Sequence, residues 1–276
     1  MKPRHVIALL LISTLGLEAA TIERIEVPSA SMETAIPVAV VLPDSYAQDA
    51  DRRYNVIYLL HGAGDNYHQW IQPGSPLHRL ADEYEFIAVC PSTGTNWYFD
   101  SPINPQIRME TFVSTELVDY IDRNYRTNAT RETRGICGLS MGGHGALYIG
   151  IRHKDTFGAV GNIFGGVDLR PFPENWNIKN VIGDQREHPE RWETYSVYHQ
   201  AKNLKDGELA LITMIGTSDF FLEVNRALHQ QLNEQGVEHH YIETSGAHDL
   251  PFAQKALPVM VRFINHYFNT GTGQLD

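Results

Sequence analysis

The sequence predicts an α/β fold in which eight strands form a mostly parallel sheet with helices on both faces. Eight short apolar runs of strand length recur along the chain, and amphipathic segments of helical length separate most of them. Several runs are apolar throughout, which is typical of parallel strands that are covered on both faces. Repeated strand–helix units of this kind build a sheet between two helical layers.

Size and composition limit the functions that the chain can have. It has 276 residues, of which 42% are hydrophobic and 20% charged, so it can bury a full core. The formal net charge of −11 argues against non-specific binding to nucleic acid or to anionic membranes. Two cysteines are too few for a disulfide-rich scaffold or for a cysteine-rich zinc module.

The first twenty residues have the pattern of a signal peptide. Lys2 and Arg4 precede an apolar run over residues 6–17, and the small residues Ala19 and Ala20 follow. Cleavage after Ala19 and cleavage after Ala20 fit equally well, and an uncleaved anchor is the alternative. The run is short for a membrane span. We expect residues 1–20 to be removed, residues 21–276 to form one domain without stable membrane insertion, and the protein to be secreted or periplasmic.

The strands and helices follow from the period of the apolar residues. The first strand alternates polar and apolar residues, and the second ends at turn residues. The eight expected strands cover residues 24–27, 36–42, 54–60, 85–90, 133–139, 159–164, 209–215 and 237–244. The expected helices cover residues 77–84, 109–125, 144–153, 222–235 and 251–268. Residues 165–207 form the longest irregular stretch and are a candidate partial lid.

One motif carries most of the chemical information. Residues 138–142, Gly-Leu-Ser-Met-Gly, match the pattern Gly-x-Ser-x-Gly, and they lie between an expected strand and an expected helix. The glycines allow close passage of the backbone through a sharp turn. Ser140 would then lie at the carboxyl end of the sheet, near amides that favour a developing negative charge. We expect Ser140 to be a nucleophile; the alternative is an idle serine in a glycine-rich turn.

A nucleophilic serine needs a base and an orienting acid, which follow it in the order acid, then histidine, in this architecture. His248 is the histidine that follows the last expected strand, so it is the candidate base. Asp219 follows the preceding strand and is the favoured acid, with Asp168 as the alternative. Asp219 could also cap the helix that follows it.

Two backbone amides are needed to bind an oxyanion, and one comes from the residue after the nucleophile. That residue is Met141. The second amide is expected from the loop after the third strand, where Ala63 is favoured and Gly62 and Gly64 are alternatives. His61 is expected to brace this loop.

No metal or cofactor is expected. The chain has no His-Glu-x-x-His motif and no acidic run with the spacing of a calcium loop. His239 and His240 are adjacent on an expected strand, so their side chains would point to opposite faces.

Taken together, the motifs resemble a known family. Tyr58-Leu59-Leu60-His61-Gly62, Trp70, Asn96-Trp97-Tyr98, Gly138 to Gly143, Gly216 to Asp219 and Gly246-Ala247-His248 occur in this order in the esterase D-like group of the α/β-hydrolase superfamily. This group includes S-formylglutathione hydrolases, tributyrin esterases, feruloyl and acetylxylan esterases, and mycobacterial mycolyltransferases. The resemblance covers about residues 35–268. It implies an α/β-hydrolase fold, a catalytic triad of Ser140, Asp219 and His248, and oxyanion donors at Met141 and Ala63.

The resemblance also bears on the two cysteines. The strand order that it implies places the third strand between the strands of Cys90 and Cys137, which are then about twice 4.8 Å apart. A disulfide needs Cα atoms within about 4.4–6.8 Å of each other. We expect two free thiols, although export would permit a bridge.

The leading functional hypothesis is a secreted serine carboxylesterase that hydrolyses small acyl or hydroxycinnamoyl esters through an acyl-enzyme. Its partner would be a small-molecule or polysaccharide-linked ester, and no nucleic acid. The expected walls of the substrate pocket are aromatic: Trp97, Tyr98, Phe164, Trp176 and Phe221.

Three alternatives remain. The chain could transfer the acyl group to a sugar or another alcohol. It could be a thioesterase of the S-formylglutathione type, which the export signal disfavours. It could also be a carbohydrate-binding protein on a hydrolase scaffold, which the ordered Ser140, Asp219 and His248 argue against.

Overall fold

The computed structural model describes residues 21–275, and the expected signal peptide over residues 1–20 lies outside them. These residues form an α/β structure around one eight-stranded sheet with the order β1-β2-β4-β3-β5-β6-β7-β8. The strands are β1 (Thr21–Ser29), β2 (Thr34–Leu42), β3 (Asn55–Leu60), β4 (Phe86–Pro91), β5 (Arg134–Leu139), β6 (Ala159–Ile163), β7 (Ala210–Gly216) and β8 (His240–Thr244). β2 pairs antiparallel with β1 and β4, and the remaining pairs are parallel. The expected fold class is confirmed.

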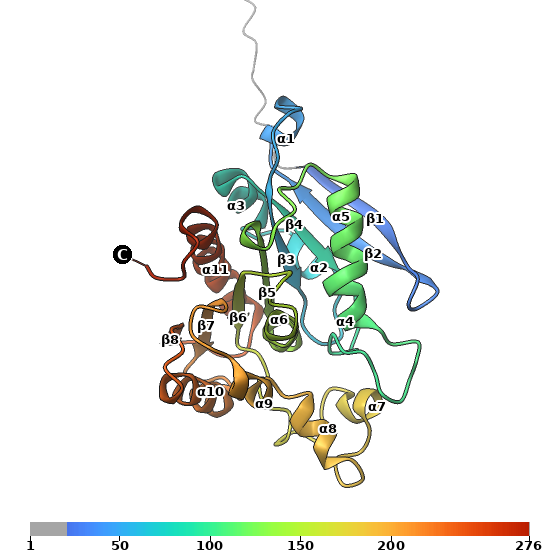
Figure 1. Ribbon diagram of the computed structural model, residues 1–276, viewed down its shortest axis with the longest axis vertical. Coiled ribbons are helices and arrows are strands. Elements are labelled where there is room, and N and C mark those ends of the chain that lie inside the picture. The colour runs from blue at the N-terminus through green and yellow to red at the C-terminus, as the bar shows by residue number, and fades with distance from the viewer. Residues whose placement is uncertain (1–20, 276) are drawn as a thin grey trace, which may run out of the picture.

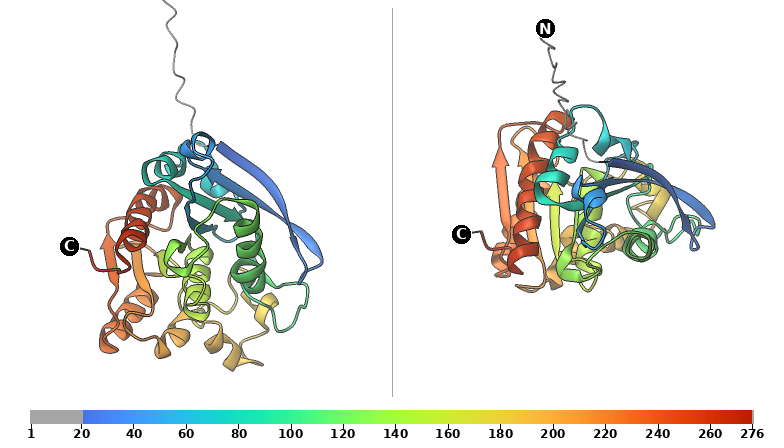
Figure 2. Two further views of the ribbon diagram at one scale, coloured as in Figure 1. Left: turned by 45° about the horizontal axis from the view of Figure 1, so that its top comes forward. Right: turned by 90° about the horizontal axis from the view of Figure 1, so that it is seen from above.

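Helices cover both faces of the sheet (Figures 1 and 2). Longer helices are α3 (Leu77–Tyr84), α5 (Leu117–Asn124), α6 (Met141–Arg152), α10 (Leu222–Glu234) and α11 (Leu250–Thr270). Figure 2 shows α3 and α11 side by side, and both pack into the core on one face of the sheet. The helices α5, α6 and α10 pack into the core on the other face.

The remaining helices are short. They are α1 (Ser45–Gln48), α2 (His68–Ile71), α4 (Met109–Thr111), α7 (Ile178–Ile182), α8 (Pro189–Thr194) and α9 (Val197–Gln200), with 3-10 turns at Arg131–Thr133 and Ala201–Asn203. The helix expected over residues 109–125 contains one π-helical stretch, Phe112–Glu116, between α4 and α5.

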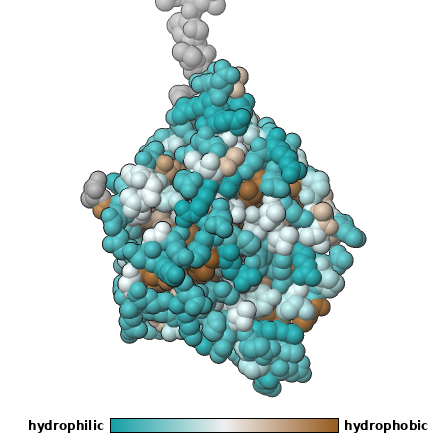
Figure 3. Space-filling view, viewed as in Figure 1, coloured by the Kyte–Doolittle hydropathy of each residue, from teal (hydrophilic) through white to brown (hydrophobic). Residues whose placement is uncertain are grey.

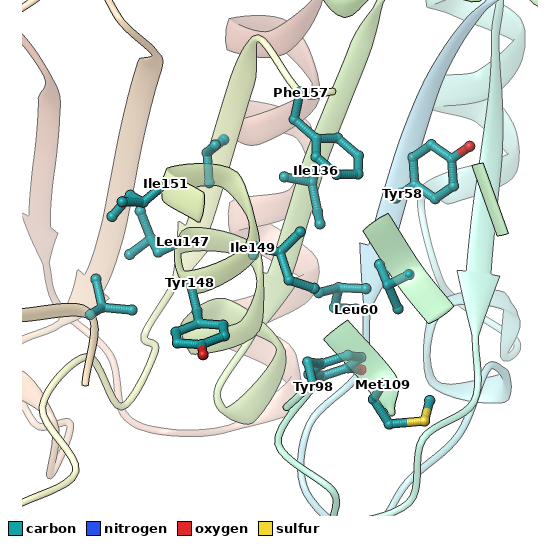
Figure 4. Close-up of a cluster of buried hydrophobic side chains, with 14 of the residues drawn as sticks. Tyr58, Leu60, Tyr98, Met109, Ile136, Leu147, Tyr148, Ile149, Ile151 and Phe157 are labelled. Atoms are coloured by element: carbon teal, nitrogen blue, oxygen red, sulfur yellow. The ribbon is translucent and has the colours of Figure 1, made fainter. Parts of the chain in front are cut away.

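Helix α6 is the most deeply buried of the described helices, with eleven of its twelve residues inside the protein. Figure 4 shows Leu147, Tyr148, Ile149 and Ile151 of this helix among apolar side chains of the sheet and the neighbouring loops. The surface is different: hydrophilic side chains cover most of the face seen in Figure 3, and apolar ones lie there in small separate groups. Because α6 is packed on nearly all sides, it holds Ser140, the residue directly before it, in a fixed position.

The segment 165–207 is more ordered than the sequence suggests. It contains α7, α8 and α9, and Trp192 is buried within it, where its Nε1 donates to the carbonyl of Gly183 at 3.0 Å. Tyr195 connects the segment to the body of the protein through a hydrogen bond from its hydroxyl to the carbonyl of Asp100 at 2.8 Å. The expectation of an irregular stretch is wrong, because tertiary contacts stabilise helices too short to form alone.

The expected free thiols are confirmed. Cys90 lies on β4 and Cys137 on β5, and β3 runs between them. Both are free and buried, and burial raises the pKa of each thiol. Within residues 21–275, no helix is long and apolar enough to cross a membrane.

Candidate active site

Ser140 occupies a strained turn between β5 and α6. Its backbone has φ 56° and ψ −119°, a conformation that a residue with a side chain rarely adopts. The flanking glycines make this turn possible, because a Cβ at Gly138 would lie 2.2 Å from the carbonyl oxygen of Gly142. A Cβ at Gly142 would lie equally close to the carbonyl of Leu60 on the adjacent strand. The close approach explains why the pattern needs glycine at both positions.

Three side chains from separate loops form one hydrogen-bonded chain. Nε2 of His248 lies 2.8 Å from Oγ of Ser140, and Nδ1 of His248 lies 2.8 Å from Oδ2 of Asp219. The carboxylate of Asp219 is fully buried, and the imidazole is 17% exposed. A carboxylate on Nδ1 fixes that nitrogen as the donor and leaves the Nε2 lone pair directed at the serine hydroxyl.

The choice between the two candidate acids follows from these contacts. Oδ1 of Asp219 also accepts a hydrogen bond from the amide of Phe221 at 2.8 Å, next to the start of α10. The carboxylate of Asp168 instead binds the guanidinium of Arg170, at 2.7 and 2.8 Å, and the hydroxyl of Ser196. Asp219 is therefore the candidate acid that contacts His248, and it also accepts from an amide at the start of α10, whereas Asp168 pairs with Arg170.

Two amides at this end of the sheet have no acceptor among the described residues. In the loop after β3, the amide of Gly62 donates to Oε1 of Gln69 at 2.7 Å, and that of Gly64 donates to the carbonyl of Gly94. Among residues 21–275, no acceptor was found for the amides of Ala63 and Met141. Of the three loop residues considered, Gly62 and Gly64 thus use their amides within the described structure, and Ala63 does not. Gln69, which the sequence analysis missed, lies on α2 and holds the amide before Ala63.

His61 braces the same loop. Its Nδ1 lies 2.7 Å from the carbonyl of Gly62, and its Nε2 accepts from the amide of Thr93 at 2.9 Å. Burial lowers the pKa of His61 and keeps the imidazole neutral. The hydroxyl of Tyr98 donates to the carbonyl of His61 at 3.1 Å.

Comparison with known proteins identifies the family. A family model described as "Putative esterase" matches residues 29–264. The chain belongs to this family. The resemblance inferred from the motifs is therefore confirmed, and the protein is a carboxylic ester hydrolase.

Individual relatives agree with this assignment. The esterase is 26% identical over 236 residues to a protein named acetyl esterase from Caldicellulosiruptor saccharolyticus, covering 77% of this chain and 85% of that one. It is 33% identical over 138 residues to an endo-1,4-beta-xylanase/feruloyl esterase from Xylanibacter ruminicola, covering 46% of this chain and 19% of that one. A solved structure titled ferulic acid esterase superposes with a TM-score of 0.78 at 26% identity, covering 91% of this chain and 99% of that one.

Four of the five aromatic residues expected to line a pocket are buried. In the esterase, Tyr98 has no exposed surface, and its ring fills the space beside Gly145 of α6. Trp97 is 1% exposed, and its Nε1 donates to the carbonyl of Trp176 at 2.8 Å. Tight packing leaves neither side chain an open face, so neither lines a pocket as the sequence predicted.

Of the other three aromatic candidates, two pack against His248 and the third packs against their neighbour Phe220. The ring of Phe164 lies 4.3 Å from the imidazole and that of Phe221 lies 5.4 Å from it, and both are buried. Trp176 is partly exposed and stacks on Phe220 with ring centroids 5.5 Å apart. Phe220, which the sequence analysis did not name, is the most exposed large apolar residue at this site. Its position directly after Asp219 was the available signal.

The polar atoms of the site do not form a metal centre. Among residues 21–275, no group of three or more histidine, cysteine or acidic side chains is arranged to hold a metal ion.

Proposed function

We propose that the esterase is an exported serine carboxylesterase in which Ser140 is the nucleophile, His248 the general base and Asp219 the orienting acid. The observation that carries this proposal is the continuous chain of two 2.8 Å hydrogen bonds from Asp219 through His248 to Ser140. The strained backbone of Ser140 supports it, since such strain is concentrated at functional positions.

In the proposed reaction, Oγ of Ser140 attacks the ester carbonyl while Nε2 of His248 takes its proton. The imidazolium then gives this proton to the departing alcohol, and an acyl-enzyme on Ser140 remains. Water attacks the acyl-enzyme with the same base, which releases the acid and restores the serine. Asp219 keeps the imidazole in the required tautomer and stabilises its charged form.

The oxyanion of each tetrahedral intermediate would bind to the amides of Ala63 and Met141. Both lack an acceptor among the described residues, and Met141 is the first residue of α6. Unpaired amides at a helix N-terminus favour negative charge. Each preorganised donor of this kind contributes about 10²- to 10³-fold to turnover.

The proposed substrates are acetyl and hydroxycinnamoyl esters, including esters linked to polysaccharides. The stacked pair of Trp176 and Phe220 beside His248 supports this choice, because it offers a planar apolar surface at the reacting centre. The names of the relatives, an acetyl esterase and two feruloyl-type esterases, point the same way.

The proposed export rests on the basic and apolar pattern of residues 1–20. Its test is N-terminal sequencing of the protein recovered outside the cytoplasm. A mature N-terminus at residue 20 or 21 is expected, and an intact Met1 in the recovered protein would refute cleavage.

The central experiment replaces the nucleophile. Ser140→Ala should lower the hydrolysis of p-nitrophenyl acetate by about 10⁴- to 10⁶-fold and abolish labelling by a fluorophosphonate probe. Ser218→Ala is the matched control, since Ser218 is an exposed serine next to Asp219 in the sequence and lies outside the hydrogen-bonded chain of Asp219, His248 and Ser140. Retention of activity in Ser140→Ala would exclude the proposed mechanism.

A substrate panel then tests the specificity. Acetyl, butyryl, feruloyl and thioester substrates at one enzyme concentration rank the acyl groups by kcat/KM. Product analysis with an added alcohol separates hydrolysis from acyl transfer.

A further inference from the structure

Two buried asparagines lie beside the site without a part in the proposed chemistry. Asn162 is on β6 and Asn225 on α10, and they are 0% and 1% exposed. Nδ2 of Asn162 donates to Oδ1 of Asn225 at 3.0 Å and to Oγ1 of Thr213 at 3.2 Å. Burying a side-chain amide costs free energy unless its polar atoms form hydrogen bonds, and both asparagines form them here.

Together the two amides hold Gly165 from both sides. The amide of Gly165 donates to Oδ1 of Asn162 at 2.8 Å, and its carbonyl accepts from Nδ2 of Asn225 at 2.8 Å. A second bond from Nδ2 of Asn225 reaches the carbonyl of Phe221 at 2.9 Å. Every N–H of the two side chains is then used, and these partners fix the orientation of both amides.

Gly165 and Phe221 lead directly to the catalytic groups. Phe164, the residue before Gly165, has φ 39° and packs its ring 4.3 Å from His248. The amide of Phe221 donates to the carboxylate of Asp219. One side chain, Asn225, therefore fixes both the loop that packs against the imidazole and the loop that orients its acid.

The same network lies against the start of α6. A Cβ at Gly143 would come within 2.5 Å of Oδ1 of Asn162, and one at Gly165 would come within 2.7 Å of the amide nitrogen of His144. This spacing leaves no room for the loop to move toward the helix. The loop position is thus defined relative to Ser140, which precedes the helix.

We infer that Asn225, together with Asn162, is a positioning residue of the esterase that holds Phe164 and Phe221 around His248 and so sets the direction of the imidazole toward Ser140. This inference rests on the proposed function. Neither asparagine touches the reacting atoms, so both act through the backbone of Gly165 and Phe221.

The first test compares Asn225→Ala with Leu228→Ala. Leu228 lies one turn further along α10 and is equally buried, but it contacts the core rather than the loop of Gly165. Asn225→Ala should lower kcat by about 10- to 100-fold with KM changed less than about threefold, because small displacements of a reacting group are costly. Leu228→Ala should lower thermal stability and leave kcat per active site within about twofold. Equal kcat values in the two variants would overturn the inference.

The second test is a double-mutant cycle with Phe164→Ala. If Asn225 acts through Phe164, Asn225→Ala should cost much less in the Phe164→Ala background than in the wild type. Additive losses would also overturn the inference. If Asn225→Ala does not fold, Asn225→Ser, which keeps one hydroxyl donor, replaces it in both tests.

Labelling of wild-type protein by the fluorophosphonate probe distinguishes a failure of the proposed function from a failure of the positioning role. An unlabelled wild type would refute the proposed function, whereas a labelled wild type with normal turnover in Asn225→Ala would refute only the positioning role.

Discussion

The ring centroid of Phe220 lies 4.1 Å from that of His248, although 53% of the Phe220 surface is exposed. Burying this ring against a neighbour would gain free energy, so its exposure is unfavourable for the isolated protein. Trp176 also stacks on this ring, at an interplanar angle of 19°. The pair therefore presents an apolar surface next to the imidazole of His248.

Phe220→Ala should reduce kcat/KM for a feruloyl ester by about tenfold, because the substrate ring loses an aromatic contact. The value for an acetyl ester should change less than about threefold, since an acetyl group has no aromatic ring to stack on the pair. Ile103→Ala is the control, as Ile103 is another exposed large apolar residue. An equal loss on both esters would contradict a role in acyl specificity.

Asp219→Asn should lower kcat by about 10⁴-fold, because an amide on Nδ1 stabilises the wrong tautomer of His248. Asp168→Asn breaks the contact with Arg170 and should affect stability rather than kcat. Steady-state kinetics of both variants, with thermal unfolding as the second measurement, distinguish the two acids. A larger kcat loss in Asp168→Asn would reverse the assignment.

Gln69→Ala removes the acceptor that holds the amide of Gly62, and the neighbouring amide of Ala63 should lose its alignment. We expect kcat to fall by about tenfold with KM little changed, since the oxyanion contact forms in the transition state. His68→Ala on the same helix α2 has an exposed side chain and should retain normal turnover. A rise in KM without a loss of kcat would indicate a substrate-binding role for Gln69 instead.

His144 should make the folded state sensitive to acid. Burial lowers its pKa to about 3, and its Nε2 donates to the carbonyl of Tyr195 at 2.9 Å. An unfolded histidine titrates near about 6.5, so between these values the unfolded chain binds a proton that the folded chain does not. Stability is therefore fully present above about pH 6.5 and is lost as the pH falls, by about 1.4 kcal/mol per pH unit.

The measurement is the free energy of unfolding in urea between pH 4 and pH 7. His144→Gln retains a donor for the Tyr195 carbonyl but does not titrate, so its curve should be flatter by about 1.4 kcal/mol per pH unit below pH 6. His68→Gln, at an exposed position, should follow the wild-type slope. Parallel curves for His144→Gln and wild type would contradict a buried neutral imidazole.

Much of the fold could be inferred from local patterns. All eight expected strands occur within a few residues of their expected positions, because strands that are buried on both faces carry a continuous apolar signal. The short helices α7, α8 and α9 could not be inferred in this way. Helices of four to six residues carry less than two turns of periodicity, and contacts such as that of Trp192 with Gly183 stabilise them.

The parts of the candidate site that depend on residues close together in the sequence could be predicted. The turn around Ser140 is encoded by adjacent glycines, and the order of Ser140, Asp219 and His248 along the chain follows from strand positions. Phe220 and Gln69 were missed, because their roles depend on which loops meet in space. The burial of Tyr98 and Trp97 could not be predicted either, since the sequence does not show whether an aromatic residue near a site lines it or packs behind it.

Residue types and their spacing were thus sufficient for the class of sheet and for the family, and they single out Ser140 as the proposed nucleophile, because each of these depends on short continuous stretches of sequence. Only the folded chain places Asp219 rather than Asp168 beside His248, leaves the amide of Ala63 without an acceptor among residues 21–275, and exposes Phe220. Each of these depends on distances between distant segments: Ser140 and His248 are 108 residues apart in the chain and 2.8 Å apart in space. Such proximity comes from the packing of helices and strands around a shared core, which no local stretch of sequence specifies.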